Sequence, residues 1–334
     1  MAAAKKSAAR PQPDLNRPAE EKKSLFKRLK KPLFLLLKIV VSGGLLWLIM
    51  HKAGIAKVAA IMKTINPAVF LGAVFLYLFS LFISSVRWGL LVRSKLSVWK
   101  LFSLYLLGAF FNTILPGLVG GDAIKGYYFY KLTGKGAEAA ASIFMERYLG
   151  FIAMLIISII AYPFGFPYLR NMGPALSLFG IRLGLLAWVL PAVVAGMLIF
   201  TALFLVLRIG KGIRYLADFY GYFDMFGKGA ITKGAIISFG VQLLNILSVF
   251  ILASSLGVKV SPSLFLVFVP LIITFSFVPL SISGLGIREA SFVLLFGSVG
   301  VSPQAATALS FAWFLSMVLA SMTGLVEYIR IKKA

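Results

Sequence analysis

Two apolar stretches that are interrupted in the middle decide how this chain folds. Residues 101–131 read LFSLYLLGAFFNTILPGLVGGDAIKGYYFYK, and residues 264–296 read LFLVFVPLIITFSFVPLSISGLGIREASFVLLF. In each, a short apolar run meets a proline, then closely spaced glycines, then a second run. Because a helix needs roughly 20 apolar residues to cross a bilayer, neither run of either stretch crosses alone. We predict that each stretch is a re-entrant hairpin, entering the membrane and leaving on the same side.

The rest of the chain has the composition of a membrane protein. Hydrophobic residues make up 60% of the 334 residues and charged residues 13%, whereas soluble domains have about 45–50% and 25%. The composition and block lengths predict an all-α polytopic membrane protein with six full transmembrane helices plus the two re-entrant broken-helix hairpins. The predicted full spans are 33–50, 68–86, 142–162, 185–207, 235–256 and 305–326.

The distribution of basic residues favours the hairpin topology. If each interrupted stretch crossed once, eight spans would place the loop 208–234 outside, although Lys and Arg are concentrated there. With two hairpins, this loop and both termini lie in the cytoplasm, and most Lys and Arg residues fall on that side, as the positive-inside rule requires.

The same topology divides the chain into an inverted repeat. Span, span, hairpin, span occurs over residues 33–163 and again over 185–326, with opposite orientations. Corresponding positions 163 residues apart share chemistry: Pro116, Gly121, Lys125 and Gly134 match Pro279, Gly284, Arg288 and Gly297. Broken segments at matching places in two inverted halves are typical of a transporter's midplane site. We expect one membrane domain, residues 32–334.

Residues 1–31 and the overall charge limit the classes of partner. This segment carries ten Lys and Arg residues and few large apolar ones, which predicts a disordered, basic cytoplasmic tail. The net charge of +24 would also suit nucleic acid. However, the basic residues sit in the tail and in short loops, where they face anionic lipid instead. The chain has no cysteine and a single histidine, so we expect no metal, no cofactor and no enzyme activity.

The interrupted segments supply the first candidate site residues. Irregular backbone inside a membrane must be sheltered by protein or water, so the breaks containing Gly121, Gly284 and Gly286 are expected to line a cavity. A half-helix that starts there offers free N–H groups to a phosphate. Lys125 and Arg288 lie about one turn into these half-helices and are expected to bind an anionic headgroup. In the alternative, Lys125 faces the cytoplasmic interface and Arg288 pairs with a carboxylate.

Five further polar residues complete the candidate set. Glu289 is placed to balance Arg288, and Asp122 either joins the site or caps a helix. Glu146 and Arg147 point about 100° apart on a helix, so they are not expected to pair only with each other. They either face the cavity, as costly intramembrane charges usually do, or lie at the interface. Asn112 either faces the site or makes an interhelical hydrogen bond.

These motifs resemble a known family. The first signature is Asn112-Thr113-Ile114-Leu115-Pro116-Gly117, Gly120-Gly121-Asp122, Lys125, Ala141-Ser142 and Glu146-Arg147, and the second is Pro279, Ser281 and Gly284-Leu285-Gly286-Ile287-Arg288-Glu289. Both are similar to the lysylphosphatidylglycerol synthetase transmembrane-region family, also called the flippase-like domain family. The resemblance covers roughly residues 33–330. Lys125 stands where the family often has Arg, which keeps the charge.

The resemblance implies a flippase-type fold in a bacterial cytoplasmic (inner) membrane that moves polar lipids between leaflets. Since only a few residues follow the last span, no soluble synthetase domain is expected, and the chain should not make the lipid itself. The resemblance also implies partnership with a separate lipid-modifying enzyme or glycosyltransferase, and a homodimer.

Our leading hypothesis is a lipid translocase whose headgroup site lies between the two hairpins, held by Arg288 and Lys125. Arg288→Ala should then reduce transport more than folding. A second hypothesis is a non-transporting scaffold that docks a lipid- or glycan-modifying enzyme through the tail and the 208–234 loop. An intramembrane transferase is a third, disfavoured because carboxylates are scarce and His51 is the only histidine.

Overall fold

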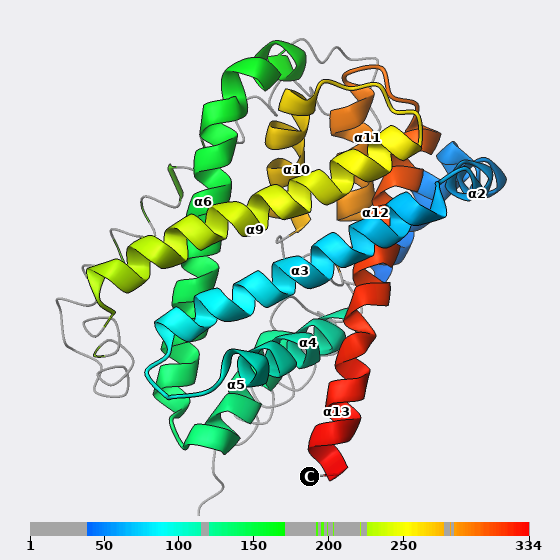
Figure 1. Cartoon of the computed structure of the whole chain (residues 1–334). Coiled ribbons are helices and arrows are strands. Elements are labelled where there is room, and N and C mark those ends of the chain that lie inside the picture. Colours follow the sequence, from blue (N-terminus) through cyan, green and yellow to red (C-terminus); the bar gives the residue numbers. More distant parts are fainter. Residues whose placement is uncertain are drawn as a thin grey trace, which may run out of the picture.

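The computed structural model describes residues 39–114, 120–170, 226–276 and 284–333, together with a few single positions between them. Within these ranges the chain forms helices and no strands (Figure 1). Four helices are long and apolar enough to cross a membrane. They are α3 (Pro67–Leu91), α6 (Gly136–Arg170), α9 (Lys228–Ser255) and α12 (Pro303–Ser321), which continues into α13 (Thr323–Lys333). The predicted all-helical membrane class is confirmed.

One further apolar pair of helices is bent. The helical segment Ile39–Ala53 and α2 (Ile55–Lys63) meet at an angle of 77°. Gly54 joins them with φ 77°, a conformation that residues with a Cβ rarely adopt. The pair is either a broken span, which brings the number in the described ranges to five, or a re-entrant loop. The predicted span 185–207 and the tail 1–31 lie outside those ranges, so the number six stays a prediction.

Short helices stand where the two hairpins are expected. α4 (Val98–Ile114) packs on α5 (Gly120–Thr133), and α10 (Pro262–Ser276) packs on α11 (Ile287–Gly297). None of these four is long enough to count as a span. Gly120 and Gly121 lie inside α5 and not before it. Arg288 is the second residue of α11, so it lies less than one turn into its helix.

Residues just before two spans explain where those spans begin. Pro67 and Pro303 occupy first-turn positions, where their missing N–H is not needed. The side chain of Asn66 accepts a hydrogen bond from the N–H of Ala68 at 2.9 Å, and that of Ser302 accepts one from Ala305 at 3.3 Å. Both caps satisfy a backbone donor that the helix itself leaves free.

Helix pairs in one half of the chain have counterparts in the other. α3 and α9 lie side by side and run in opposite directions (Figure 1). α6 packs on α9 and α10, while α12 packs on α3, and α12 with α13 packs on α4. α6 therefore contacts α9 and α10 in the second half of the chain, just as α12 contacts α3 and α4 in the first.

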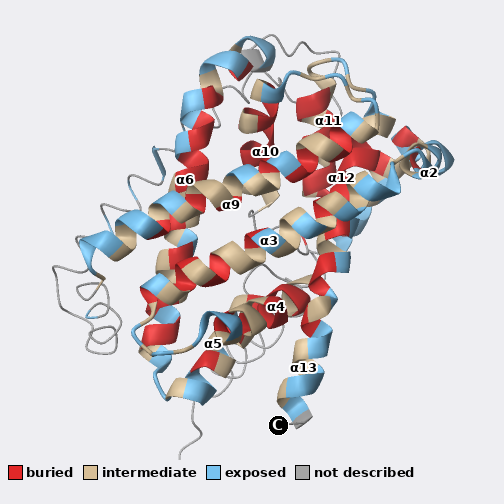
Figure 2. Cartoon of the chain, viewed as in Figure 1, coloured by how far each residue is buried: buried red, intermediate tan, exposed pale blue. Residues whose placement is uncertain are grey.

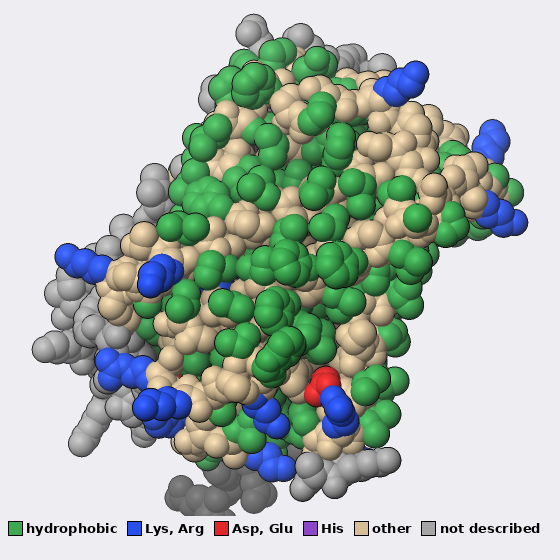
Figure 3. All heavy atoms as spheres, viewed as in Figure 1, with side chains coloured by type: hydrophobic (Ala, Val, Ile, Leu, Met, Phe, Trp, Pro, Cys, Tyr) green, Lys and Arg blue, Asp and Glu red, His purple; other side chains and the backbone are tan. Residues whose placement is uncertain are grey.

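The buried residues lie where these helices pack against one another. The inner faces of α4, α10, α11 and α12 are buried (Figure 2), and the largest core gathers aromatic rings such as Phe265, Phe268, Phe292 and Phe296. Hydrophobic side chains also cover the middle of the outer face seen in Figure 3, while Lys and Arg gather toward its margins. An exposed apolar band between basic ends is what a bilayer requires.

Glu138 ties the loop after α3 to the start of α6. It is 1% exposed, and Oε1 accepts the N–H groups of Arg93 at 2.5 Å and Ser94 at 2.8 Å. We expect Glu138→Ala to lower the free energy of unfolding by about 2–4 kcal/mol, because two backbone donors lose a charged acceptor. Heating in detergent followed by size-exclusion chromatography measures this. Lys135→Gln removes only a half-exposed partner of Glu138 and should change little; equal losses would contradict the assignment.

Candidate functional site

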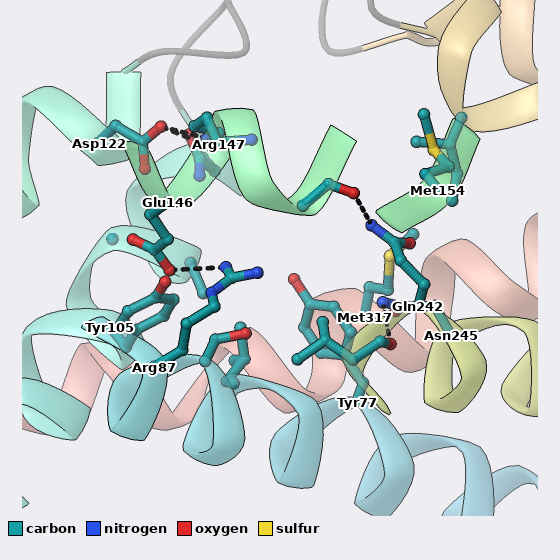
Figure 4. Close-up of a pocket in the computed structure, with 18 of the residues that line it drawn as sticks. Tyr77, Arg87, Tyr105, Asp122, Glu146, Arg147, Met154, Gln242, Asn245 and Met317 are labelled. Atoms are coloured by element: carbon teal, nitrogen blue, oxygen red, sulfur yellow. Dashed lines mark hydrogen bonds and ion pairs between the residues drawn. The ribbon is translucent and has the colours of Figure 1, made fainter. Parts of the chain in front are cut away.

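A cavity of about 370 Å³ lies among the helices of the bundle. Its walls come from α3, α4, α5, α6, α9, α10 and α12, so both halves of the chain contribute. One part of the wall is charged, and the rest combines polar residues such as Tyr77, Gln242 and Asn245 with apolar ones such as Met154 and Met317 (Figure 4). The volume falls within the range typical of small-molecule sites, about 300–1,000 Å³.

Five charged residues of the wall form a continuous series, which we call the charge chain: Arg87, Glu146, Lys125, Asp122 and Arg147. Arg87 Nη2 lies 2.8 Å from Glu146 Oε1, and Lys125 Nζ lies 2.9 Å from Glu146 Oε2. Lys125 Nζ is 3.8 Å from Asp122 Oδ1, and Asp122 Oδ2 is 2.6 Å from Arg147 Nη2. Positive and negative groups therefore alternate from α3 through α6 and α5 and back to α6, with a cation at each end. Figure 4 shows the outer two pairs, Arg87 with Glu146 and Asp122 with Arg147.

Most of the charge chain is buried. The side chains of Arg87, Lys125 and Glu146 are 8%, 4% and 3% exposed, whereas that of Arg147 is 46% exposed. Glu146 bridges two buried cations, and removal of water from such groups is costly unless each has partners. The chain therefore runs from the interior of the bundle to an accessible end at Arg147.

Neighbouring groups stabilise the two buried cations further. Arg87 Nη1 donates to Ser238 Oγ of α9 at 2.8 Å. Lys125 Nζ lies 4.0 Å from the ring centroid of Tyr105 and 4.7 Å from that of Trp88. Cation–π contacts of this kind are favourable and strongest where water is excluded.

The helix that carries Lys125, α5, packs closely against α4. The Oδ1 atom of Asn112 accepts the N–H of Gly121 at 2.8 Å. A Cβ at Gly121 would overlap the carbonyl oxygen of Gly108, so the absence of a side chain permits this close packing. Asn112 thus lines the cavity and also makes the interhelical hydrogen bond of the alternative interpretation.

Known proteins similar to this chain support its membrane character. The family described as "Lysylphosphatidylglycerol synthase TM region" matches residues 35–323. The chain belongs to this family. The resemblance seen in its two signatures is therefore confirmed.

A 140-residue segment, 40% of the chain, is also 26% identical to the UPF0104 membrane protein PH1989 of Pyrococcus horikoshii. The match spans 41% of that protein, so the chain covers about two fifths of its relative's length.

In this member of the lysylphosphatidylglycerol synthase TM region family, the cavity brings together one group of predicted site residues. Asn112, Asp122, Lys125, Glu146 and Arg147 all line it. Asp122 is the third residue of α5, and its carboxylate pairs with Arg147 and Lys125. Glu146 and Arg147 each pair with residues other than one another, as their angular separation predicts.

A second group of predicted residues lies at the second hairpin, outside the lining of this cavity. Arg288 Nη2 is 2.5 Å from Glu289 Oε1, and Glu289 Oε2 accepts the N–H of Gly286 at 2.7 Å. The Arg288 guanidinium lies 4.3 Å from the ring centroid of Phe314. Gly284 and Gly286 have φ of 77° and 84° in the turn before α11. These contacts match the alternative in which Arg288 pairs with a carboxylate, and its role in binding stays a prediction.

Arg87 is a charged residue of the site that the sequence interpretation missed. The predicted span 68–86 ends immediately before it. The helix instead continues to Leu91, and Arg87 is 7% exposed. The signal for its burial was present, because Trp88, Leu90 and Leu91 extend the apolar pattern beyond it.

The described residues also limit metal binding. Within them, no three His, Cys, Asp or Glu side chains lie close enough together to hold a metal ion. Asp122 and Glu146, the acidic residues of the cavity wall, are both engaged by cations. The paired cations and carboxylates of the wall can bind a charged or polar group.

Proposed function

We propose that this chain is a lipid translocase that moves a polar, phosphate-bearing lipid between the two leaflets of a bacterial inner membrane, and is not an enzyme. The buried charge chain in the cavity wall carries the proposal. Ionisable residues inside a membrane are costly and usually mark a pathway or site for polar cargo. The headgroup would enter the cavity while the acyl or polyprenyl chains stay in lipid.

The proposed architecture has six spans and two re-entrant hairpins, arranged as inverted repeats 33–163 and 185–326, with both termini cytoplasmic. Three observations support it: the short paired helices at both hairpins, the opposite directions of α3 and α9, and the matching helix contacts in the two halves. Because the cavity is lined from both halves, rocking of one repeat against the other would open it to alternate sides.

We assign the residues separate roles within this proposal. Arg87, Lys125 and Arg147 attract the headgroup, while Glu146 and Asp122 hold these cations in place. Asn112 and Gly121 fix the hairpin. Arg288, Glu289, Gly284 and Gly286 form the corresponding element of the second repeat, and we propose that they meet the headgroup when the cavity faces the opposite side.

Movement of fluorescent lipids in proteoliposomes tests the function. The wild-type chain should move lipids with phosphate-bearing headgroups, and Arg87→Gln should slow this at least about tenfold, since truncating one member of a buried charge pair costs several kcal/mol. Arg330→Gln is the matched control, because Arg330 is exposed and does not line the cavity; its rate should equal that of the wild type.

Two results would argue against this assignment. Equal rates for Arg87→Gln and wild type would move the site away from the charge chain. Absence of movement of every lipid by folded wild-type protein would contradict the translocase and favour the scaffold that docks a lipid- or glycan-modifying enzyme.

A further inference from the structure

α2 lies where three of the long apolar helices begin or end. Three residues separate it from α3, which begins at Pro67, and the N–H of Asn66 donates to Oγ of Ser255, the last residue of α9, at 2.9 Å. α2 also packs against Ala308, in the second turn of α12. Figure 1 shows α2 at the margin of the bundle, beside the first turns of α3. Because the ends of membrane-crossing helices mark the surface of the hydrocarbon layer, α2 lies at the level of the lipid headgroups.

The direction of α2 agrees with this position. It is bent by 77° from the apolar helix Ile39–Ala53, so it runs close to the membrane plane if that helix crosses. Its nine residues extend over only about 14 Å, less than half of the roughly 30 Å of hydrocarbon. Trp47, in the helix before the bend, is exposed, and tryptophan is enriched at membrane interfaces.

The side chains of α2 form three faces. Val58 is 2% exposed and packs against Ala308. Ile55, which is 65% exposed, and the exposed Ala59 lie four residues apart on a second face. Lys57 is two residues from each of them, which places it about 160–200° around the helix. One side of α2 is therefore apolar and the opposite side is basic, with the packed face between them.

The surface at α2 carries only positive charge. Residues 39–67 contain Lys52, Lys57 and Lys63 and no Asp or Glu. All three lysines are exposed. This stretch therefore supplies no carboxylate to balance them. Negatively charged lipid headgroups supply such counter-charges, and they attract basic residues that lie at the membrane surface.

We propose that α2 is an interfacial anchor that lies on the membrane surface and binds negatively charged lipid headgroups. Ile55 and Ala59 enter the boundary of the acyl chains, while Lys57 faces the phosphates. Lys63 lies nearer the apolar side and reaches the phosphates with its long side chain. The bend at Gly54 turns the chain from a crossing helix onto the surface. This anchor goes beyond the translocase function and does not depend on it.

Depth measurements test the orientation of α2. The chain has no cysteine, so a single introduced cysteine can carry a nitroxide label without background. Ala59→Cys and Ala60→Cys make the same change at neighbouring exposed residues, the first on the apolar side and the second toward Lys57. In proteoliposomes, collisions are compared for oxygen, which dissolves in hydrocarbon, and for a water-soluble nickel complex. The oxygen-to-nickel ratio should be at least about threefold higher for Ala59→Cys, since an interfacial helix buries only its apolar face.

Three other arrangements would give different results. Equal ratios with both labels open to nickel would show that α2 stands clear of the membrane. Collisions with oxygen alone at both labels would place α2 inside the hydrocarbon, as part of a broken span or a re-entrant loop. Few collisions with either reagent at both labels would show that a second copy or another protein covers the helix. Each of these results would overturn the anchor.

The preference for charged lipids tests the partner. A bimane fluorophore attached at Ala59→Cys is quenched by brominated acyl chains that come close to it. In phosphatidylcholine vesicles, brominated phosphatidylglycerol should quench it at least about threefold more than the same fraction of brominated phosphatidylcholine, because exposed lysines concentrate anionic lipid. Adding Lys57→Gln and Lys63→Gln should abolish this preference. Equal quenching by the two lipids before these changes would overturn the proposal.

The matched control removes the same charge from the other end of α9. Lys228→Gln with Lys233→Gln changes two exposed lysines in the first turns of that helix, whose last residue, Ser255, lies beside α2. The control should leave the preference for phosphatidylglycerol at the Ala59→Cys label unchanged. An equal loss in both double variants would mean that overall charge attracts the lipid and would contradict a local site at α2.

Discussion

Glu146→Ala should lower the free energy of unfolding by about 3–5 kcal/mol, the cost of removing one partner of a buried ion pair. Glu146 Oε1 and Oε2 lie 2.8 Å and 2.9 Å from the cationic groups of Arg87 and Lys125. Without this carboxylate, two buried positive charges would share the cavity wall with no acid between them. Thermal unfolding of the protein in detergent, followed by tryptophan fluorescence, measures the loss.

A double variant separates charge imbalance from lost packing. Glu146→Ala with Lys125→Met returns the wall to its original net charge, because one acid and one base are removed together. We expect it to recover at least half of the stability lost in the single variant. Arg330→Ala is a control on an exposed cation that pairs with Glu327, and it should cost about 1 kcal/mol or less. A Glu146→Ala protein as stable as this control would show that the charge chain does not stabilise the fold.

Gly121→Ala should disrupt the first hairpin and with it the cavity. An added Cβ would overlap the Gly108 carbonyl oxygen and lie 2.6 Å from Asn112 Cγ. Because one obstacle is backbone, α5 must move away from α4, which displaces Asp122 and Lys125. We expect the free energy of unfolding to fall by at least about 3 kcal/mol, at the upper end for overpacked sites. Lipid movement should be at least about tenfold slower.

The matched control is Gly240→Ala in α9, where nothing lies within 4 Å of the added Cβ. Alanine is the better helix former by about 1 kcal/mol, so this variant should be as stable as wild type or more stable. Replacing glycine by alanine should therefore lower the stability at Gly121 and keep or raise it at Gly240. A neutral Gly121→Ala, with normal thermal stability and lipid movement, would contradict the close packing of the hairpin.

The membrane class, the positions of most spans and the two short paired helices could be predicted from the sequence. These properties depend on local composition and on the length of apolar runs, because the thickness of the bilayer sets the length of helix that can cross it. Membership in the family followed from the residues of the two hairpins and from Glu146-Arg147, and it is confirmed. The predicted span at 185–207 and the inverted repeat rest on the same reasoning and stay predictions.

Only the tertiary structure decided how the charges pair. Arg87 precedes Glu146 by 59 positions and Ser238 by 151, and no local pattern indicates that these residues meet. Lys125 and Arg288 are equivalent in the sequence pattern, yet Lys125 joins the cavity while Arg288 pairs with the adjacent Glu289. The physical reason is that apolar runs specify where a helix lies in the membrane, whereas the partner of a buried charge depends on which helix faces pack together.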